Sequence, residues 1–209
     1  MDNFIYRNKI PCYNLFKEPL TFINLLDTSK HIVLYYTNSK FGKIVQFEFI
    51  KQGLLKGENG IYCIPDYENK SKIEDEMNQY GIDVKYYIKI GLLTIFKIPN
   101  LLRHSKGVLK GSEEVLDNML SDINSNNSFR LVVRFIDKLN TKEEIDANLV
   151  LEKYYHLKFC KFKGSILCHY DVDNCPANSN PQWLHSIFET HHSAIFITDF
   201  DGKGVAFEL

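Results

Sequence analysis

The stretch HIVLYYTNSKFGKIVQFEFIKQGLLKG, residues 31–57, decides the expected fold, because it places a helix directly after a buried strand. His31–Tyr36 is a short apolar run rich in β-branched and aromatic residues, and it is too short for a helix. From Phe41 to Leu54 the apolar residues form one stripe over about four helical turns, which ends at Gly57. A strand followed by a helix is the unit from which parallel sheets are built.

The same unit recurs along the rest of the chain. Further strands are predicted at Gly60–Pro65, Leu92–Ile98, Phe129–Ile136 and Gly164–Tyr170. Further helices are predicted over Asn69–Tyr80, from a cap at Ser112, from a T-x-x-E capping box at Thr141 to about Leu157, and from Asn180-Pro181 to Thr190. The chain then closes with a predicted antiparallel hairpin, Ala194–Thr198 and Val205–Leu209 around an Asp201-Gly202 turn. The pattern predicts an α/β fold with a mostly parallel sheet and helices on both of its faces.

Composition narrows the class of protein. The 209 residues contain no apolar run near the ~18 residues of a membrane span, and the N-terminus lacks the apolar segment of a signal peptide. Five cysteines without a CxxC pair fit a reducing compartment, so a cytoplasmic protein is expected. A net charge of −1 argues against direct nucleic-acid binding. No linker divides the chain, and we expect an N-terminal arm over residues 1–27, packed on the domain or exchanged with a second copy, before one domain over 28–209.

The loop after the first strand lies where a phosphate-binding loop would lie. Residues 37–44 fall in the register of G-x-x-x-x-G-K-[ST], but Thr37 replaces the first glycine and Ile44 replaces the hydroxyl that holds Mg²⁺. Gly42 and Lys43 remain, and the start of the helix could still hold an anion. The alternative is an ordinary turn with a solvated Lys43. We therefore expect no ATP hydrolysis, and a nucleotide-binding protein that uses Lys43 and Asp137 remains the second hypothesis.

Metal-capable side chains gather near the fifth strand, in Cys168–Cys175 and at His185, His191 and His192. The C-x₆-C spacing matches none of the tight ligand pairs of zinc sites. Alternation along the strand directs Cys168 and His169 to opposite faces, so the two cannot act as a nucleophile and its base. From these spacings the prediction is that the protein holds no metal and no cofactor.

Ligands of such sheets bind beyond the carboxyl ends of the strands. Polar and aromatic residues at the predicted strand ends combine the surfaces typical of a small-molecule site. Asp137 and His169 also have plain interpretations, as a turn former and as a hydrogen-bonded buried histidine. With the loop after the first strand, the candidate ligand-binding residues are Tyr36, Thr37, Asn38, Ser39, Lys40, Gly42, Lys43, Asp66, Asp137, His169 and Asp171.

Short motifs in a fixed order give the chain a family resemblance over about residues 28–198. They are His31–Tyr36, Phe49–Leu54 with Gly57-Glu58, Ile61-Tyr62, Tyr80–Val84 with Gly91–Leu93, Glu152, Cys168–Asp171 and Thr190-His191. In these the sequence resembles the MEDS domain, the methanogen/methylotroph DcmR sensory domain. The resemblance implies a RecA/KaiC-like α/β fold with an eroded phosphate loop, and a sensory role toward small organic compounds beside helix-turn-helix or histidine-kinase modules.

Two departures from that family shape the expected function. We expect no helix-turn-helix or kinase segment in the first 27 residues or after Leu209, and Arg134–Asp137 replaces the family's usual stretch after the fourth strand. We therefore expect a non-catalytic sensory module that binds a small organic molecule or anion at the strand ends. Its signal is expected to pass through a protein partner or through self-association.

Overall fold

One sheet forms the middle layer of the computed structural model, which describes residues 17–27, 29–121, 127–174, 181–197 and 203–209. Its seven strands lie in the order β3-β2-β4-β5-β1-β6-β7. All neighbouring pairs are parallel except β6 and β7, so the predicted mostly parallel sheet and the C-terminal antiparallel hairpin are both confirmed. The strands are β1 (His31–Tyr36), β2 (Asn59–Pro65), β3 (Leu93–Ile98), β4 (Phe129–Val133), β5 (Gly164–Asp171), β6 (Ser193–Ile197) and β7 (Gly204–Glu208).

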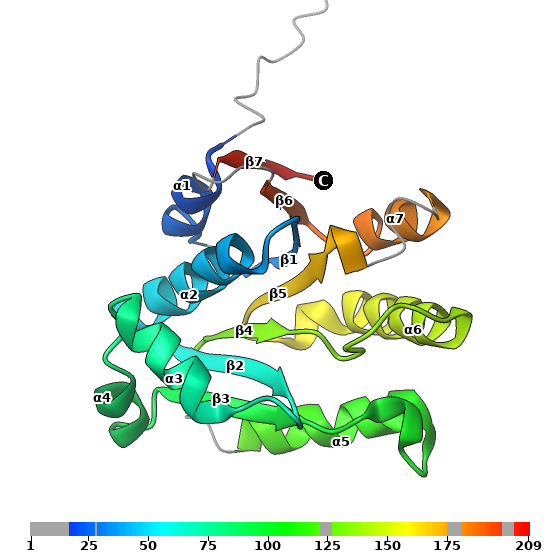
Figure 1. Cartoon of the computed structure of the whole chain (residues 1–209), viewed down its shortest axis with the longest axis horizontal. Helices are drawn as coiled ribbons and strands as arrows, with labels where there is room; N and C mark the ends of the chain where they lie inside the picture. The colour runs from blue at the N-terminus through cyan, green and yellow to red at the C-terminus, as the bar shows by residue number, and fades with distance from the viewer. Residues whose placement is uncertain (1–16, 28, 122–126, 175–180, 198–202) are drawn as a thin grey trace, which may run out of the picture.

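Helices cover both faces of this sheet, as predicted. Figure 1 shows α1, α2 and α3 on one side of the strands and α5, α6 and α7 on the other. Short 3-10 turns at Leu101–Arg103, Phe159–Lys161 and Val172–Asn174 complete the connections. The helices are α1 (Pro19–Asn24), α2 (Ser39–Leu55), α3 (Lys70–Gln79), α4 (Val84–Lys89), α5 (Gly107–Ser121), α6 (Lys142–Lys158) and α7 (Pro181–Phe188).

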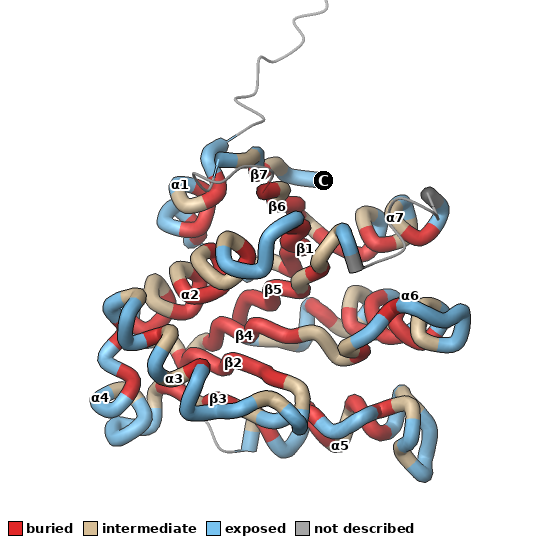
Figure 2. Tube along the Cα trace, in the orientation of Figure 1, coloured by how far each residue is buried: buried red, intermediate tan, exposed pale blue. Residues whose placement is uncertain are grey.

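Burial follows from this layering. All six residues of β1 are buried, as expected for a central parallel strand covered on both faces (Figure 2). Alternate residues of the strand enter opposite cores: Ile32 and Leu34 pack with α1, α2 and α3, whereas Val33 and Tyr35 pack with α5, α6 and α7. Whether a residue of a central strand is at an odd or an even position therefore decides which layer of helices its side chain contacts.

The prediction of a helix cap at Ser112 is wrong. Helix α5 begins at Gly107, and Ser112 lies buried inside it, where its hydroxyl donates to the Leu109 carbonyl and accepts from Tyr155 at 2.9 Å. The helix therefore starts before the best local cap, because Val108 packs against the core beneath α5. Glu113 and Glu114 consequently lie beyond the first turn, where they pair with lysines.

The predicted fourth strand is too long. β4 ends at Val133, which is paired with Cys168, and the chain then turns at Arg134, whose guanidinium pairs with Asp137 at 2.6 Å. Helix α4 was not predicted, because its six residues are too few for a periodic signal, and it is capped locally by Asp83. The Asn180 cap and the Asp201-Gly202 turn lie outside the described residues.

Part of the predicted N-terminal arm packs on the domain. Phe22, Ile23 and Leu26 are buried in the core beside α2, and Lys17 forms a backbone bridge with Ala206 of β7. None of the helices formed by the described residues is both long and apolar enough to cross a membrane.

Candidate functional site

A cleft of about 380 Å³ opens at the carboxyl ends of β1, β2, β4 and β5. The connections from β1 and from its neighbour β5 leave in opposite directions across the sheet, which is where ligands of open α/β sheets bind. Three tyrosine rings and a histidine contribute aromatic surface, and charged groups lie around them. The lining residues are Tyr36, Ser39, Lys43, Gln46, Tyr62, Cys63, Ile64, Pro65, Tyr67, Glu68, Asn69, Lys72, Arg134, Asp137 and His169.

Two hydrogen-bonded groups give the cleft its polar surface. The Tyr36 hydroxyl lies 3.2 Å from Nδ1 of His169, and the two rings stack. Burial, with the nearby charges of Arg134 and Lys43, holds the pKa of His169 well below its usual range, so the imidazole is neutral. Opposite, the Tyr67 hydroxyl donates to Asp137, and this hydrogen bond raises the pKa of Tyr67 to about 12. The cleft thus presents neutral hydrogen-bonding groups beside an internally paired Asp137.

The connection between β1 and α2 has no phosphate-loop shape. Only Thr37 and Asn38 separate the strand from the helix, and the Asn38 side chain accepts from the backbone N–H of Lys40 at 2.9 Å. A Cβ atom on Gly42 would lie 2.6 Å from the Tyr36 ring. Gly42 therefore lets the helix pack closely against Tyr36. The Asn38 side chain accepts from one of the backbone N–H groups at the helix start, so that group is not available to an anion.

The alternative interpretation of Lys43 as a solvated surface charge is wrong. Its ammonium lies 2.5 Å from Glu76 and 4.0 Å from Glu68, and about a quarter of its side chain is exposed. Glu76 lies on α3, which packs beside α2 and so places the carboxylate next to Lys43. Lys43 lines the cleft with its charge already paired.

The other predicted residues divide among neighbouring hollows. Asp66 lines a second hollow of about 460 Å³, which shares Tyr67, Arg134 and Asp137 with the cleft. Asp171 lines a third beside Tyr36 and Ser39, and its carboxylate accepts from the backbone N–H of Asp173. Lys40 lies in an outer groove on α2, while Thr37, Asn38 and Gly42 do not line the cleft. The structure therefore brings together Tyr36, Ser39, Lys43, Asp137 and His169.

Sequence reasoning missed three important lining residues. Tyr62 donates to Gln46 at 2.7 Å from inside β2, and Tyr67 and Arg134 follow the ends of β2 and β4. Tyr67 follows the end of β2 just as Asp66 does, so the strand-end rule applies equally to it. Arg134 lay inside the predicted strand Phe129–Ile136, so the rule could not select it until β4 was seen to end at Val133.

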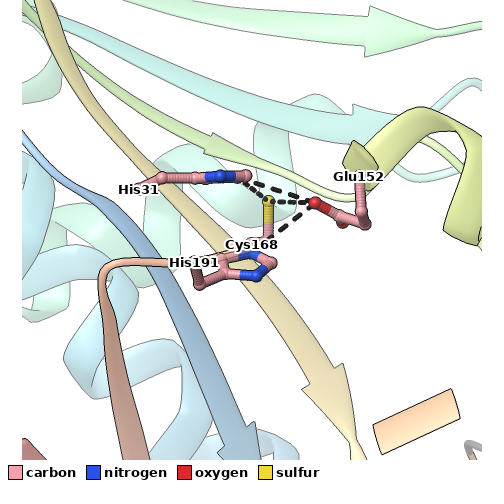
Figure 3. Close-up of side chains that lie close together, drawn as sticks. All are labelled: His31, Glu152, Cys168 and His191. Atoms are coloured by element: carbon pink, nitrogen blue, oxygen red, sulfur yellow. Dashed lines mark hydrogen bonds and ion pairs between the residues drawn. The ribbon is translucent and has the colours of Figure 1, made fainter. Parts of the chain in front are cut away.

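A second polar group lies buried between the sheet and α6. His31, Glu152, Cys168 and His191 come from β1, α6, β5 and the residue pair before β6, and their ligand-capable atoms lie within 4.8 Å of one another (Figure 3). The Glu152 carboxylate is fixed on one oxygen, which accepts from Tyr170. Asn148 donates to the Tyr170 hydroxyl at 2.9 Å and accepts from Trp183.

Burial controls the protonation of this group. It raises the pKa of Glu152 to about 7 and that of the Cys168 thiol well above its usual range. It lowers the pKa of His31 far below normal and that of His191 to about 3. All four residues belong to the sequence motifs, but no ligand spacing connects them, because they lie in separate segments of the chain.

The family described as MEDS, the methanogen/methylotroph, DcmR sensory domain, matches residues 30–192. The chain belongs to this family. MEDS is a family of sensory domains, so this chain has a role in sensing and signal transduction. None of the curated protein sequences matches the chain.

A solved structure supports the fold of this MEDS domain. It is similar to a KaiC-like protein, PH0186, from the archaeon Pyrococcus horikoshii OT3, with a TM-score of 0.53 and 14% sequence identity. The match covers 85% of this chain and 76% of the archaeal one. The fold is therefore RecA/KaiC-like, as the family resemblance implied.

Proposed function

We propose that this MEDS domain is a non-catalytic sensor that binds a small, weakly charged organic molecule in the cleft at the strand ends. The observation that supports the proposal most is the lining of the cleft, which combines Tyr36, Tyr62, Tyr67 and His169 with a few polar groups. Its volume of about 380 Å³ falls within the roughly 300–1,000 Å³ range of small-molecule pockets.

The charges around the cleft favour a weakly charged ligand over a nucleotide. Lys43 is paired with Glu76 at 2.5 Å, and Arg134 is paired with Asp137 at 2.6 Å. A triphosphate would have to break these pairs and would meet Glu68 as well. The two-residue connection after β1 also offers no extended backbone to surround phosphates. ATP hydrolysis is therefore not part of the proposed function.

The output of the sensor passes to another protein or to a second copy of the chain. Binding changes that association by favouring one of two states, because a ligand shifts an equilibrium only through its different affinities for them. Molar mass measured by light scattering, with and without a stabilising compound, tests this part of the proposal. Proteins captured on the immobilised chain are compared in the same way, with and without the compound. An unchanged molar mass together with an unchanged set of captured proteins contradicts this part of the proposal.

Thermal-shift screening of the full chain tests the ligand. Short-chain alcohols, amines, aldehydes and phenols are compared with ATP, ADP and Mg²⁺, and the proposal expects stabilisation by one of the organic classes alone. A ligand at 100 times its dissociation constant stabilises by about 2.7 kcal/mol, enough for a clear shift. Stabilisation by nucleotide alone would support the second hypothesis instead.

Two tyrosine variants locate the binding site. Tyr67→Phe removes the hydroxyl that donates to Asp137, and Tyr36→Phe removes the one beside His169. Each is expected to weaken binding of the stabilising compound by about tenfold, the effect of one lost hydrogen bond. Tyr86→Phe is the matched control, because Tyr86 is half exposed on α4 and does not line the cleft. Equal affinity in all three variants would exclude the cleft.

A further inference from the structure

We propose that His31, Glu152, Cys168 and His191 form a zinc site, which is separate from the cleft. The four donor types, two imidazole nitrogens, a thiolate and a carboxylate oxygen, are those that Zn²⁺ accepts in proteins. The described residues contain one such group of histidine, cysteine and carboxylate side chains, and all four members are buried.

Four of the six distances between the donor atoms match a tetrahedral site. Zinc bonds of about 2.0–2.3 Å at tetrahedral angles separate neighbouring ligand atoms by about 3.3–3.6 Å. Nε2 of His31 lies 3.3 Å from Sγ of Cys168 and 3.6 Å from Oε2 of Glu152. Oε2 of Glu152 lies 3.6 Å from the same Sγ and 3.5 Å from Nε2 of His191. These four pairs of ligand atoms have the spacing that an ion requires, and all the ligand atoms lie within 4.8 Å of one another.

The tautomer of His191 points to a ligand. Its Nδ1 lies 2.7 Å from the Ile187 carbonyl, which can only accept, so Nδ1 carries the proton and Nε2 carries a lone pair. That Nε2 is buried and has no hydrogen-bond partner among the described residues. Metal-binding histidines usually donate one ring N–H to a carbonyl while the other ring nitrogen faces the remaining metal ligands, and His191 has this arrangement.

The carboxylate is prepared in a similar way. Tyr170 donates to Oε1 of Glu152, Asn148 donates to the Tyr170 hydroxyl, and Trp183 donates to Asn148. This leaves Oε2 directed at His31, Cys168 and His191, as the close-up shows (Figure 3). Outer hydrogen bonds of this kind orient metal ligands.

The charge of the four groups suits one divalent ion. Two neutral imidazoles, one thiolate and one carboxylate around Zn²⁺ sum to zero, whereas the same groups buried without an ion include polar atoms that lack partners. With four protein ligands and no open position, the zinc would be structural. It would fasten β1, α6, β5 and the start of β6 together.

Metal binding to the full chain tests the proposal. The protein is treated with chelator and then titrated with Zn²⁺ or Co²⁺. The proposal expects one ion per chain, a higher midpoint of thermal unfolding, and the visible bands of tetrahedral Co²⁺ with a thiolate charge-transfer band. Cys168→Ala and His191→Gln should each weaken binding at least tenfold, as loss of a ligand does. Cys63→Ala, another buried cysteine, and His185→Gln, an exposed histidine, should leave it unchanged.

A measurement on the wild-type protein keeps the test decisive if the ligand variants do not fold. X-ray absorption of the zinc-loaded chain should show one sulfur and three nitrogen or oxygen neighbours. No binding of Zn²⁺ or Co²⁺ by folded protein, a ligand shell without sulfur or with two sulfurs, or full binding by folded Cys168→Ala would each overturn the proposal.

Discussion

The Tyr170 hydroxyl joins three buried polar side chains, since it accepts from Asn148 and donates to Glu152 while Asn148 accepts from Trp183. We expect Tyr170→Phe to lower the free energy of unfolding by about 1–3 kcal/mol, because Asn148 and Glu152 would each lose a partner without access to water. Urea denaturation in the presence of chelator measures this cost. Tyr86→Phe on the exposed face of α4 should cost almost nothing, and equal losses in the two variants would contradict the prediction.

Lys43 provides a second prediction at the residue scale. Lys43→Met removes an ammonium paired with Glu76 at 2.5 Å and leaves that carboxylate partly buried, so a loss of up to about 1 kcal/mol is expected. Lys40→Met, one turn earlier on the exposed side of α2, is the control and should change stability far less. The difference should shrink at high salt, which screens partly exposed pairs. A salt-independent difference would assign the cost to packing.

At the scale of an element, the packing of α2 requires a glycine at position 53, because a side chain there would collide with Arg130. Arg130 of β4 is buried against this helix, where it pairs with Glu58 at 2.6 Å and donates to the carbonyls of Phe49 and Leu26. A Cβ atom on Gly53 would lie 2.7 Å from Cδ of Arg130. Gly53→Ala should therefore destabilise by about 1–3 kcal/mol, although alanine normally favours a helix.

A double-mutant cycle checks this interpretation. In an Arg130→Ala background the clashing Cδ is absent, so Gly53→Ala should cost much less or become favourable. Chemical denaturation of the four proteins gives the coupling free energy. The same cost in both backgrounds would show that Gly53 is required for another reason.

The elements also show how far sequence reasoning reaches. Thr141 and Glu144 form the predicted capping box, because both halves of its hydrogen-bond pattern lie within four residues. The start of α5 could not be predicted in this way, since it depends on packing of Val108 in the folded core rather than on the cap offered by Ser112. A helix start that is fixed by neighbouring residues could be predicted from the sequence. A helix start that depends on contacts in the folded core could not.

The candidate sites show the same limit. Tyr36 and His169 were predicted at the cleft because strand ends and strand alternation are periodic features of a sequence. The buried group was not predicted, because its four residues come from separate elements and the sheet alone brings His31 to His191. Motif spacing can detect metal ligands that lie within one segment of the chain. It cannot detect ligands that are far apart in the sequence and come together only in the folded sheet.

At the scale of the whole molecule, α1 covers one end of the core. Phe22, Ile23 and Leu26 are buried there, and the Leu26 carbonyl accepts from both Lys56 and Arg130. A chain that begins at residue 28 should therefore lose about 5–9 kcal/mol or fail to fold, on ~1.5–3 kcal/mol for each of the three buried apolar side chains. A chain that begins at residue 17 keeps these contacts and is the matched control. Equal thermal stability of the two truncated chains would show that α1 is dispensable.

Strand β5 places the two sites on either side of one peptide bond. Cys168 faces the buried group with Glu152, and His169 faces the cleft with Tyr36, so neither can move along the strand without the other. Free-energy coupling between two sites is reciprocal. Hence, if zinc tightens the hold of the cleft on an organic molecule tenfold, that molecule must tighten the hold on zinc tenfold. A sensor built in this way would read the concentration of a compound and the supply of a metal as one signal.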